Sequence, residues 1–212
     1  MKGIFRKDML YIRQNIKFYA GMIILFSIAG IASNGRSADF SGTLMLPLLY
    51  GAMIPHTLLS HDTQSHFLQT IGIFPVSRRQ YIGEKYLFTL LCMGVMVVYM
   101  ALVITVDVLY NRITLTPPHI ASLLLYLGSG FLFPAVSIPL WTLLCNLDRS
   151  VYICCSALMG GLLGAMLVLL ITISGRSVLT PQGASLLLLG SLLLFGVSFF
   201  IADAIFRRKD IH

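Results

Sequence analysis

Six long apolar runs, separated by mostly short polar connectors, dominate the sequence. Only 11% of the 212 residues are charged, whereas soluble domains carry roughly 25%. A helix needs about 20 predominantly apolar residues to cross a bilayer, and in lipid a helix satisfies all its own backbone groups. The pattern therefore predicts an all-α integral membrane protein with six transmembrane helices. We expect these spans near residues 18–33, 42–59, 86–108, 120–144, 151–173 and 184–206.

The distribution of positive charge predicts which side of the membrane each connector faces. With six spans, all but three of the 15 Lys and Arg residues fall on the side of the N-terminus. These residues lie in segments 1–17, 60–86, 145–150 and 203–212, and the exceptions are Arg36, Arg112 and Arg176. Because cytoplasmic loops retain an excess of Lys and Arg, both termini are predicted to be cytoplasmic. The net charge of +7 has the same explanation and needs no nucleic-acid partner.

Residues 1–16 show an amphipathic pattern ahead of the first span. A basic helix of this kind lies in the membrane interface, with its charged side toward lipid phosphates. We predict such an interfacial helix and keep a solvated basic leader as the alternative. Its apolar face comprises Ile4, Phe5, Met9, Ile12 and Ile16, and its polar face comprises Lys2, Arg6, Lys7, Arg13 and Gln14.

Residues 60–86 form the one long polar insertion of the chain. A segment this charged is excluded from hydrocarbon, so we expect it to enter the cytoplasm between the second and third spans. The pattern from Thr63 to Ile71 predicts a short amphipathic helix within it. We expect Pro75 to end this helix and Ser77 to cap the next one. The charged residues of the insertion are Asp62, Arg78, Arg79, Glu84 and Lys85.

The sequence contains no motif for an enzymatic reaction. It lacks the GxxxxGK[ST] phosphate-binding loop as well as HExxH and GxSxG, so no catalytic residue is predicted. His56, His61 and His66 are spaced i, i+5, i+10, which turns around a helix instead of aligning on one face. The four cysteines have no zinc-ligand spacing, so no metal site is predicted either. Asp203 and Arg207 are expected to form an i,i+4 ion pair.

Two features of the later spans are candidates for a translocation path or for helix packing. Pro134 and Pro139 predict that the fourth span is broken or bent, which is tolerated where a helix lines a cavity or packs on neighbours. In the fifth span, Gly160, Gly161 and Gly164 belong to small-xxx-small pairs, which let helix backbones approach closely. Such an approach could serve packing within one subunit or a seam between two subunits.

Two stretches of the chain resemble the ABC-2 type permeases. The opening MKGIFRKDMLYIRQN and the stretch FPVSRRQYIGEKYL, Phe74 to Leu87, are similar to motifs of a small bacterial six-span subfamily. The layout of six spans, an N-terminal interfacial helix and a cytoplasmic segment after the second span also resembles that family. The stretch HDTQSHF departs from it, because relatives usually begin this stretch with a more acidic or aromatic sequence.

The resemblance implies a single permease domain, residues 1–212, in the bacterial plasma membrane and without a nucleotide-binding domain. Two permease subunits, identical or paralogous, would assemble with separate ATPase subunits that bind ATP and Mg. Residues Thr63 to Ile71 would be the coupling helix on which the ATPase docks. The subfamily is associated with export of amphipathic or antimicrobial peptides, including phenol-soluble modulins, which implies a similar cargo. The residues expected at the ATPase contact are Thr63, His66, Phe67, Leu68, Ile71, Arg78 and Arg79.

Alternatives remain for both the arginines and the whole chain. Arg78 and Arg79 could reflect only the positive charge of cytoplasmic loops or contacts to lipid phosphates. The chain could also be an immunity or anchor protein that binds a peptide or partner without transport. An intramembrane enzyme is disfavoured, because no nucleophile–base pair or metal-ligand set is readable. An ATPase that co-purifies with the chain would distinguish the permease from the alternatives.

Overall fold

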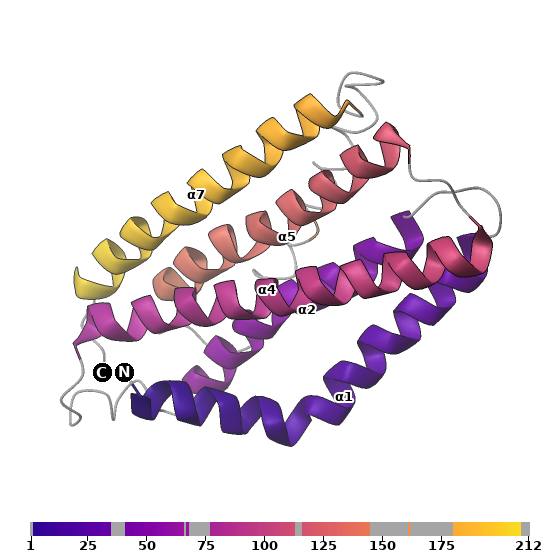
Figure 1. Ribbon diagram of the computed structural model, residues 1–212. Coiled ribbons are helices and arrows are strands. Elements are labelled where there is room, and N and C mark those ends of the chain that lie inside the picture. The colour runs from indigo at the N-terminus through magenta and orange to yellow at the C-terminus, as the bar shows by residue number, and fades with distance from the viewer. Residues whose placement is uncertain are drawn as a thin grey trace.

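The computed structural model describes residues 2–34, 41–65, 67, 77–112, 116–144, 161 and 180–208. Over these residues the chain forms five helices and no strand, which confirms the predicted all-α class. The helices are α1 (Lys2–Asn34), α2 (Ser41–Gln64), α4 (Arg78–Asn111), α5 (Pro117–Leu144) and α7 (Pro181–Arg208) (Figure 1).

Three of these helices contain segments long and apolar enough to cross a membrane, namely Arg78–Tyr110, His119–Leu144 and Pro181–Arg208. They contain the predicted third, fourth and sixth spans. Helices α1 and α2 contain the residues of the first and second predicted spans. The predicted fifth span lies outside the described residues, apart from Gly161. The number of six spans and their orientation therefore stay predictions.

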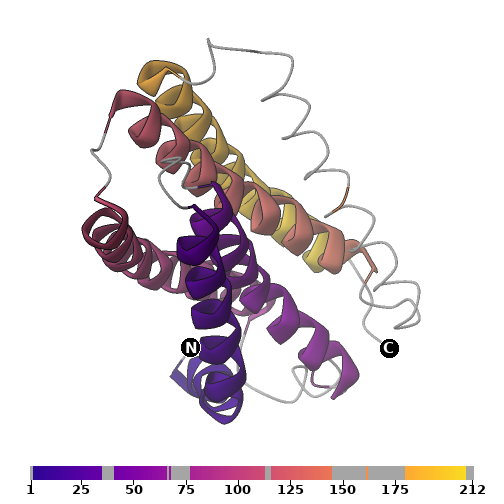
Figure 2. The same cartoon turned by 90° about the vertical axis from the view of Figure 1, so that its right-hand side faces the viewer.

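The described helices form one bundle in which α2 is central. Helix α2 packs against α1, α4 and α5, and α5 packs along α7. Figures 1 and 2 both show α5 and α7 side by side, with α1 and α2 on the other side of the bundle. Helices α1 and α4 run in one direction and α2, α5 and α7 in the other (Figure 1). The start of α1, the end of α2 and the start of α4 therefore gather at one end, which we call the charged end.

Small residues let the central helices approach closely. A Cβ atom added at Gly130 of α5 would lie 2.7 Å from Met93 Cε of α4 and 3.0 Å from Leu48 Cδ2 of α2. Both neighbours are buried, with exposed fractions of 1% and 0%. Protein interiors are packed at near-crystalline density, so there is no room for a side chain at this position. The absence of a side chain at Gly130 therefore lets α5 approach α2 and α4 closely.

The fourth span was predicted to be broken or bent, and of these two alternatives the break is wrong. Helix α5 is one helix from Pro117 to Leu144, and Pro134 and Pro139 both lie inside it. Each proline removes one backbone hydrogen bond, but such helices persist where neighbouring elements hold them in place. Helix α5 is held in this way by α2 and α7. The hydroxyl of Thr142 also donates a hydrogen bond of 2.7 Å to the carbonyl of Pro139.

The residues of the predicted interfacial helix and of the first predicted span lie in one continuous helix, residues 2–34, and the placement of residues 1–16 in the membrane interface stays a prediction. No proline and no glycine cap interrupts the chain at the expected junction, so α1 continues, and Figure 1 shows it bending part-way along its length. The predicted apolar face matches only in part. Ile4 is buried, whereas Met9 and Ile16 are exposed, and Asp8 is fully buried on the packed side.

We predict that Gly130→Leu lowers the free energy of unfolding by about 1–3 kcal/mol, because the new side chain overpacks the junction with Leu48 and Met93. Gly94→Leu is the matched control, since a Cβ atom there meets no atom within 4 Å among the described residues. Chemical denaturation of the purified variants in detergent measures the difference. Equal loss of stability in both variants would contradict the close approach at Gly130.

Candidate functional site

Four charged side chains form a closed ring at the charged end. Lys85 Nζ of α4 lies 2.8 Å from Asp62 Oδ2 of α2 and also contacts Asp8 of α1. Lys7 Nζ of α1 contacts Asp62 and lies 3.4 Å from Asp8 Oδ1. Each ammonium group therefore faces two carboxylates, and each carboxylate faces two ammonium groups. We call Lys7, Asp8, Asp62 and Lys85 the ion quartet.

The ion quartet is largely removed from water. The side chains of Asp8, Asp62 and Lys85 are 1% exposed, and that of Lys7 is 31% exposed. Removing a charge from water costs several kcal/mol per ion unless partners compensate for it. Here each charge has two opposite charges, and the Tyr81 hydroxyl adds a hydrogen bond of 2.7 Å to Asp62 Oδ2. The quartet thus joins α1, α2 and α4 by mutual compensation of buried charge.

The surroundings of Asp62 favour its charged form. Burial alone would raise the pKa of this carboxyl, but the charges of Lys85 and Lys7 hold the pKa below its ordinary value. A lowered pKa in the folded state means that the ionised carboxylate stabilises the fold at neutral pH. This contribution is lost as the pH falls through the lowered pKa.

The expectation that the whole insertion lies in water is wrong for three of its charges. Asp62, Glu84 and Lys85 are all buried, with exposed fractions of 1 to 3%. They can be buried because Lys7 and Asp8 of α1 compensate for part of the charge. Sequence reasoning missed Asp8, and the available signal was that it is the one acidic residue in an otherwise basic leader.

The predicted start of the coupling helix is also wrong. Thr63 does not begin a new helix, because it belongs to the last turn of α2, which ends at Gln64. Its hydroxyl oxygen accepts a 2.9 Å hydrogen bond from Trp141 Nε1 of α5. Thr63 therefore joins α2 to α5 and is directed into the bundle. Three other residues of this helix that were predicted to contact the ATPase lie outside the described residues, namely His66, Leu68 and Ile71.

Phe67 is described, and its ring packs against the ion quartet. Lys7 Nζ lies 3.7 Å from the centroid of the ring, which is the geometry of a cation–π interaction. The ring centroid is 6.5 Å from that of Tyr81. Phe67 was expected to contact an ATPase, but in this structure it is partly buried against Lys7 and Tyr81. It therefore connects the segment after α2 with the quartet.

The predicted cap of the following helix is confirmed. Ser77 Oγ accepts a hydrogen bond of 3.2 Å from the backbone N–H of Gln80. In return, the backbone N–H of Ser77 donates to Gln80 Oε1 over 3.1 Å. This reciprocal capping box satisfies two backbone donors and starts α4 at Arg78.

Arg78 and Arg79 connect the start of α4 with the end of α7. The Arg78 guanidinium donates to the carbonyls of Phe206 and Arg207, over 3.5 and 3.2 Å. Cations at the end of a helix are stabilised by its unpaired carbonyls. Arg79 Nε lies 3.9 Å from Asp203 Oδ2, and Asp203 also forms the expected ion pair with Arg207 at 2.8 Å. The two predicted contact arginines therefore have structural partners within the chain.

An aromatic cluster lies directly beside the quartet. Tyr81 of α4 stacks on Phe206 of α7, with ring centroids 5.7 Å apart. Trp141 of α5 lies 6.3 Å from Tyr81 and 6.2 Å from Phe206. All three rings are fully buried. The charged end thus brings together side chains from all five described helices.

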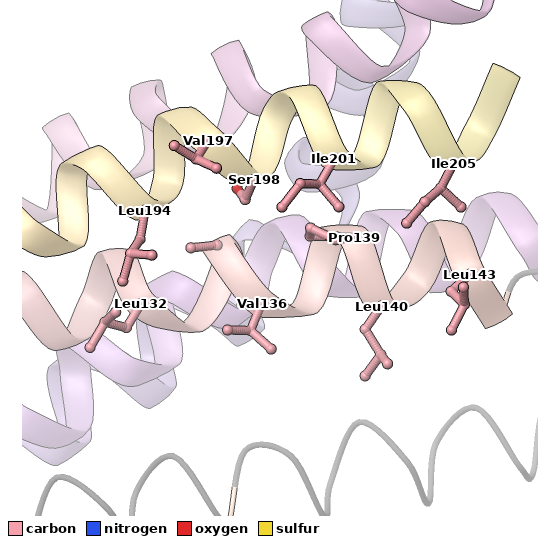
Figure 3. A pocket seen from close by; sticks show the side chains of 11 residues that line it. Leu132, Val136, Pro139, Leu140, Leu143, Leu194, Val197, Ser198, Ile201 and Ile205 are labelled. Carbon is pink, nitrogen blue, oxygen red and sulfur yellow. The ribbon is translucent and has the colours of Figure 1, made fainter.

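An apolar groove of about 370 Å³ runs between α5 and α7. Pro139 lines this groove. Pro134 is buried and does not belong to the lining. Ser198 is the one polar residue of the lining, and its hydroxyl already donates to the carbonyl of Phe195. Figure 3 shows the lining side chains of both helices along this groove. They are Leu132, Ala135, Val136, Pro139, Leu140, Leu143, Leu194, Val197, Ser198, Ile201 and Ile205.

The remaining candidate residues that the structure describes are not assembled into a site. Among the described residues, no three His, Cys, Asp or Glu side chains are placed to hold a metal ion. His61 packs on Tyr11 at 4.4 Å between ring centroids. A Cβ atom added at Gly161 meets no atom within 4 Å among the described residues. Gly160 and Gly164 lie outside the described residues.

Comparison with known proteins decides the family. Residues 3–207 match the model of the ABC-2 family transporter proteins. The chain belongs to this family. No curated protein sequence and no solved structure matches it. ABC-2 permeases are membrane components of ABC transporters and normally work with a separate ATPase subunit, so the chain is a multi-pass membrane protein of such a transporter.

We predict that Asp62→Asn lowers the free energy of unfolding of this ABC-2 protein by about 3–5 kcal/mol, because it leaves buried lysine charge without a partner. Asp203→Asn is the control, since its partners Arg79 and Arg207 are more than half exposed. Fully exposed pairs are worth about 0–1 kcal/mol, and the pairs of Asp203, which is itself 9% exposed, are expected to contribute more than this but less than the quartet. Chemical denaturation in detergent compares the two, and equal losses would show that the quartet is not the stronger interaction.

Proposed function

We propose that this chain is the permease subunit of an ATP-driven ABC exporter, and that a separate ATPase docks on residues 60–86. One observation carries the proposal: both sides of this segment are tied to the helices of the bundle at the charged end. Thr63 and Phe67 contact α5 and α1 on one side. Arg78 contacts α7 on the other.

This arrangement suits the transmission of movement. A push on a segment that is linked to several helices displaces those helices, whereas a push on a loosely attached loop is absorbed by the loop. Packed helices respond to such a push by small rigid shifts between discrete arrangements. The contacts at the charged end are therefore what an ATPase would need in order to change the arrangement of the membrane helices.

The proposed orientation places the charged end in the cytoplasm. The polar ends of α1, α2, α4 and α7 meet there, and they carry most of the described Lys and Arg residues. At the opposite end, Asp107 and Arg112 are the charged residues among those described. Retention of positive charge on the inner side supports this orientation. ATP and Mg bind to the ATPase, because the chain itself has no phosphate-binding loop.

The cargo we propose is an amphipathic or antimicrobial peptide. Apart from Ser198, the groove between α5 and α7 is lined by apolar side chains, which suits the apolar face of such a peptide better than a sugar or an ion. A second permease, identical or paralogous, would complete the path across the bilayer. An immunity or anchor role without transport is the outcome if no ATPase accompanies the chain.

We predict that Leu68→Asp combined with Ile71→Asp lowers recovery of the ATPase with the tagged chain about tenfold or more, which corresponds to a loss of about 1.4 kcal/mol in binding. The measurement is affinity purification from the native host followed by mass spectrometry. Phe67 is left unchanged, because its substitution would also disturb Lys7.

Ile113→Asp combined with Leu115→Asp is the matched control, since it places the same two charges between α4 and α5. The control should retain the ATPase. Full ATPase recovery with the double variant would exclude docking at residues 68–71. Absence of any ATPase with the unaltered chain would exclude the permease function and leave the immunity or anchor role.

A further inference from the structure

Glu84 lies beside the ion quartet but belongs to none of its pairs. The residue is 3% exposed, and neither carboxylate oxygen has a hydrogen-bond partner among the residues that the structure describes. Buried carboxylates normally accept hydrogen bonds or pair with a cation. Leaving a buried acceptor without a hydrogen bond costs free energy, so the position of Glu84 needs a physical explanation.

The quartet and Glu84 together hold more carboxyl groups than ammonium groups. The quartet contains two lysines and two aspartates, whose charges balance one another, and Glu84 adds a third carboxyl group that interacts with all four charges. Among the described residues, the site therefore holds three carboxyl groups and two ammonium groups. Because the attraction between opposite charges is strong in a poorly hydrated site, a lysine that leaves one carboxylate of the site can be stabilised by another.

Lys7 is the member of the quartet that is best placed to move. Its side chain is 31% exposed, whereas the other three are 1% exposed. Its contact with Asp8 is the longest in the ring, and Asp8 Oδ1 has no hydrogen-bond partner among the described residues. Lys7 also carries the cation–π contact with Phe67. Displacement of Phe67 would remove that contact and free Lys7 to change partners.

We propose that Glu84 is a positioning residue that receives Lys7 when the segment after α2 is displaced. In the arrangement seen here, Lys7 of α1 is paired with Asp62 of α2. In the second arrangement it is paired with Glu84 of α4. The exchange shifts α1 from α2 toward α4 and makes the quartet a two-state joint. This inference rests on the proposed function, since an ATPase would supply the displacement.

Glu84→Gln tests the exchange in the complex of the full chain with its co-purified ATPase, reconstituted in lipid nanodiscs. We expect the rate of ATP hydrolysis to fall at least tenfold, because the permease can no longer adopt the second arrangement. Recovery of the ATPase and the thermal unfolding midpoint should be unchanged or raised, since Glu84 makes no hydrogen bond with any of the described residues. A merely structural carboxylate would instead lower the midpoint.

Two further variants make the test specific. Glu84→Asp keeps the charge and should restore part of the hydrolysis rate. In a Lys7→Met background, Glu84→Gln should cause no additional loss, because the two residues act as one pair. Unchanged hydrolysis in Glu84→Gln, additive losses with Lys7→Met, or a lowered midpoint in Glu84→Gln would each overturn the exchange. Failure of the unaltered chain to retain an ATPase would overturn the proposed function instead, and this result is seen before any variant is compared.

Discussion

A buried charge has to be compensated, and this requirement organises the charged end of the protein. Lys7 and Asp8 of α1, Asp62 of α2 and Lys85 of α4 can leave water only as a group. Their compensation holds three helices in one relative position. The neighbouring rings of Tyr81, Trp141 and Phe206 extend this fixed region to α5 and α7, so the remaining helices are positioned from the same place.

The same cluster changes how the segment between α2 and α4 is understood. An insertion with this many charges suggests a solvated loop that presents its residues to a partner. Thr63, Phe67 and Arg78 instead contact the membrane helices. Residues that sit at such contacts act on the helices directly, and their substitution disturbs the bundle as well as any surface. Function at this segment therefore depends on what its buried side chains hold together as much as on what its exposed ones bind.

Buried ion clusters contribute little stability compared with apolar side chains of the same volume, because desolvation offsets much of their attraction. Their distinctive property is that a charged side chain can exchange one partner for another when helices shift, whereas an apolar contact is simply lost. Glu84 fits this view, since it places a third carboxyl group beside the two lysines, and neither of its oxygens has a hydrogen-bond partner among the described residues. The apolar packing of Gly130 against Leu48 and Met93 supplies rigidity away from the cluster.

The sequence by itself determined the features that depend on residues close in the chain. Apolar runs specify helices, Ser77 and Gln80 form a capping box across three residues, and Asp203 pairs with Arg207 across four. Sequence reasoning could also recognise the family, since the motifs that carry the resemblance are contiguous. It did not decide whether Pro134 and Pro139 break or only bend their helix, because packing against neighbouring helices outweighs the local cost of a proline.

Only the tertiary structure decided which charges meet. Lys7 lies 55 residues from Asp62, and Asp8 lies 77 residues from Lys85. Hydrophobic periodicity shows that a residue is polar, but it carries no information about a partner on another helix. A lone charge in that pattern looks solvated, whereas the same charge opposite a compensating one is buried. The fold brings an oppositely charged partner close to the charge. This partner compensates for the loss of water, so the charge can be buried.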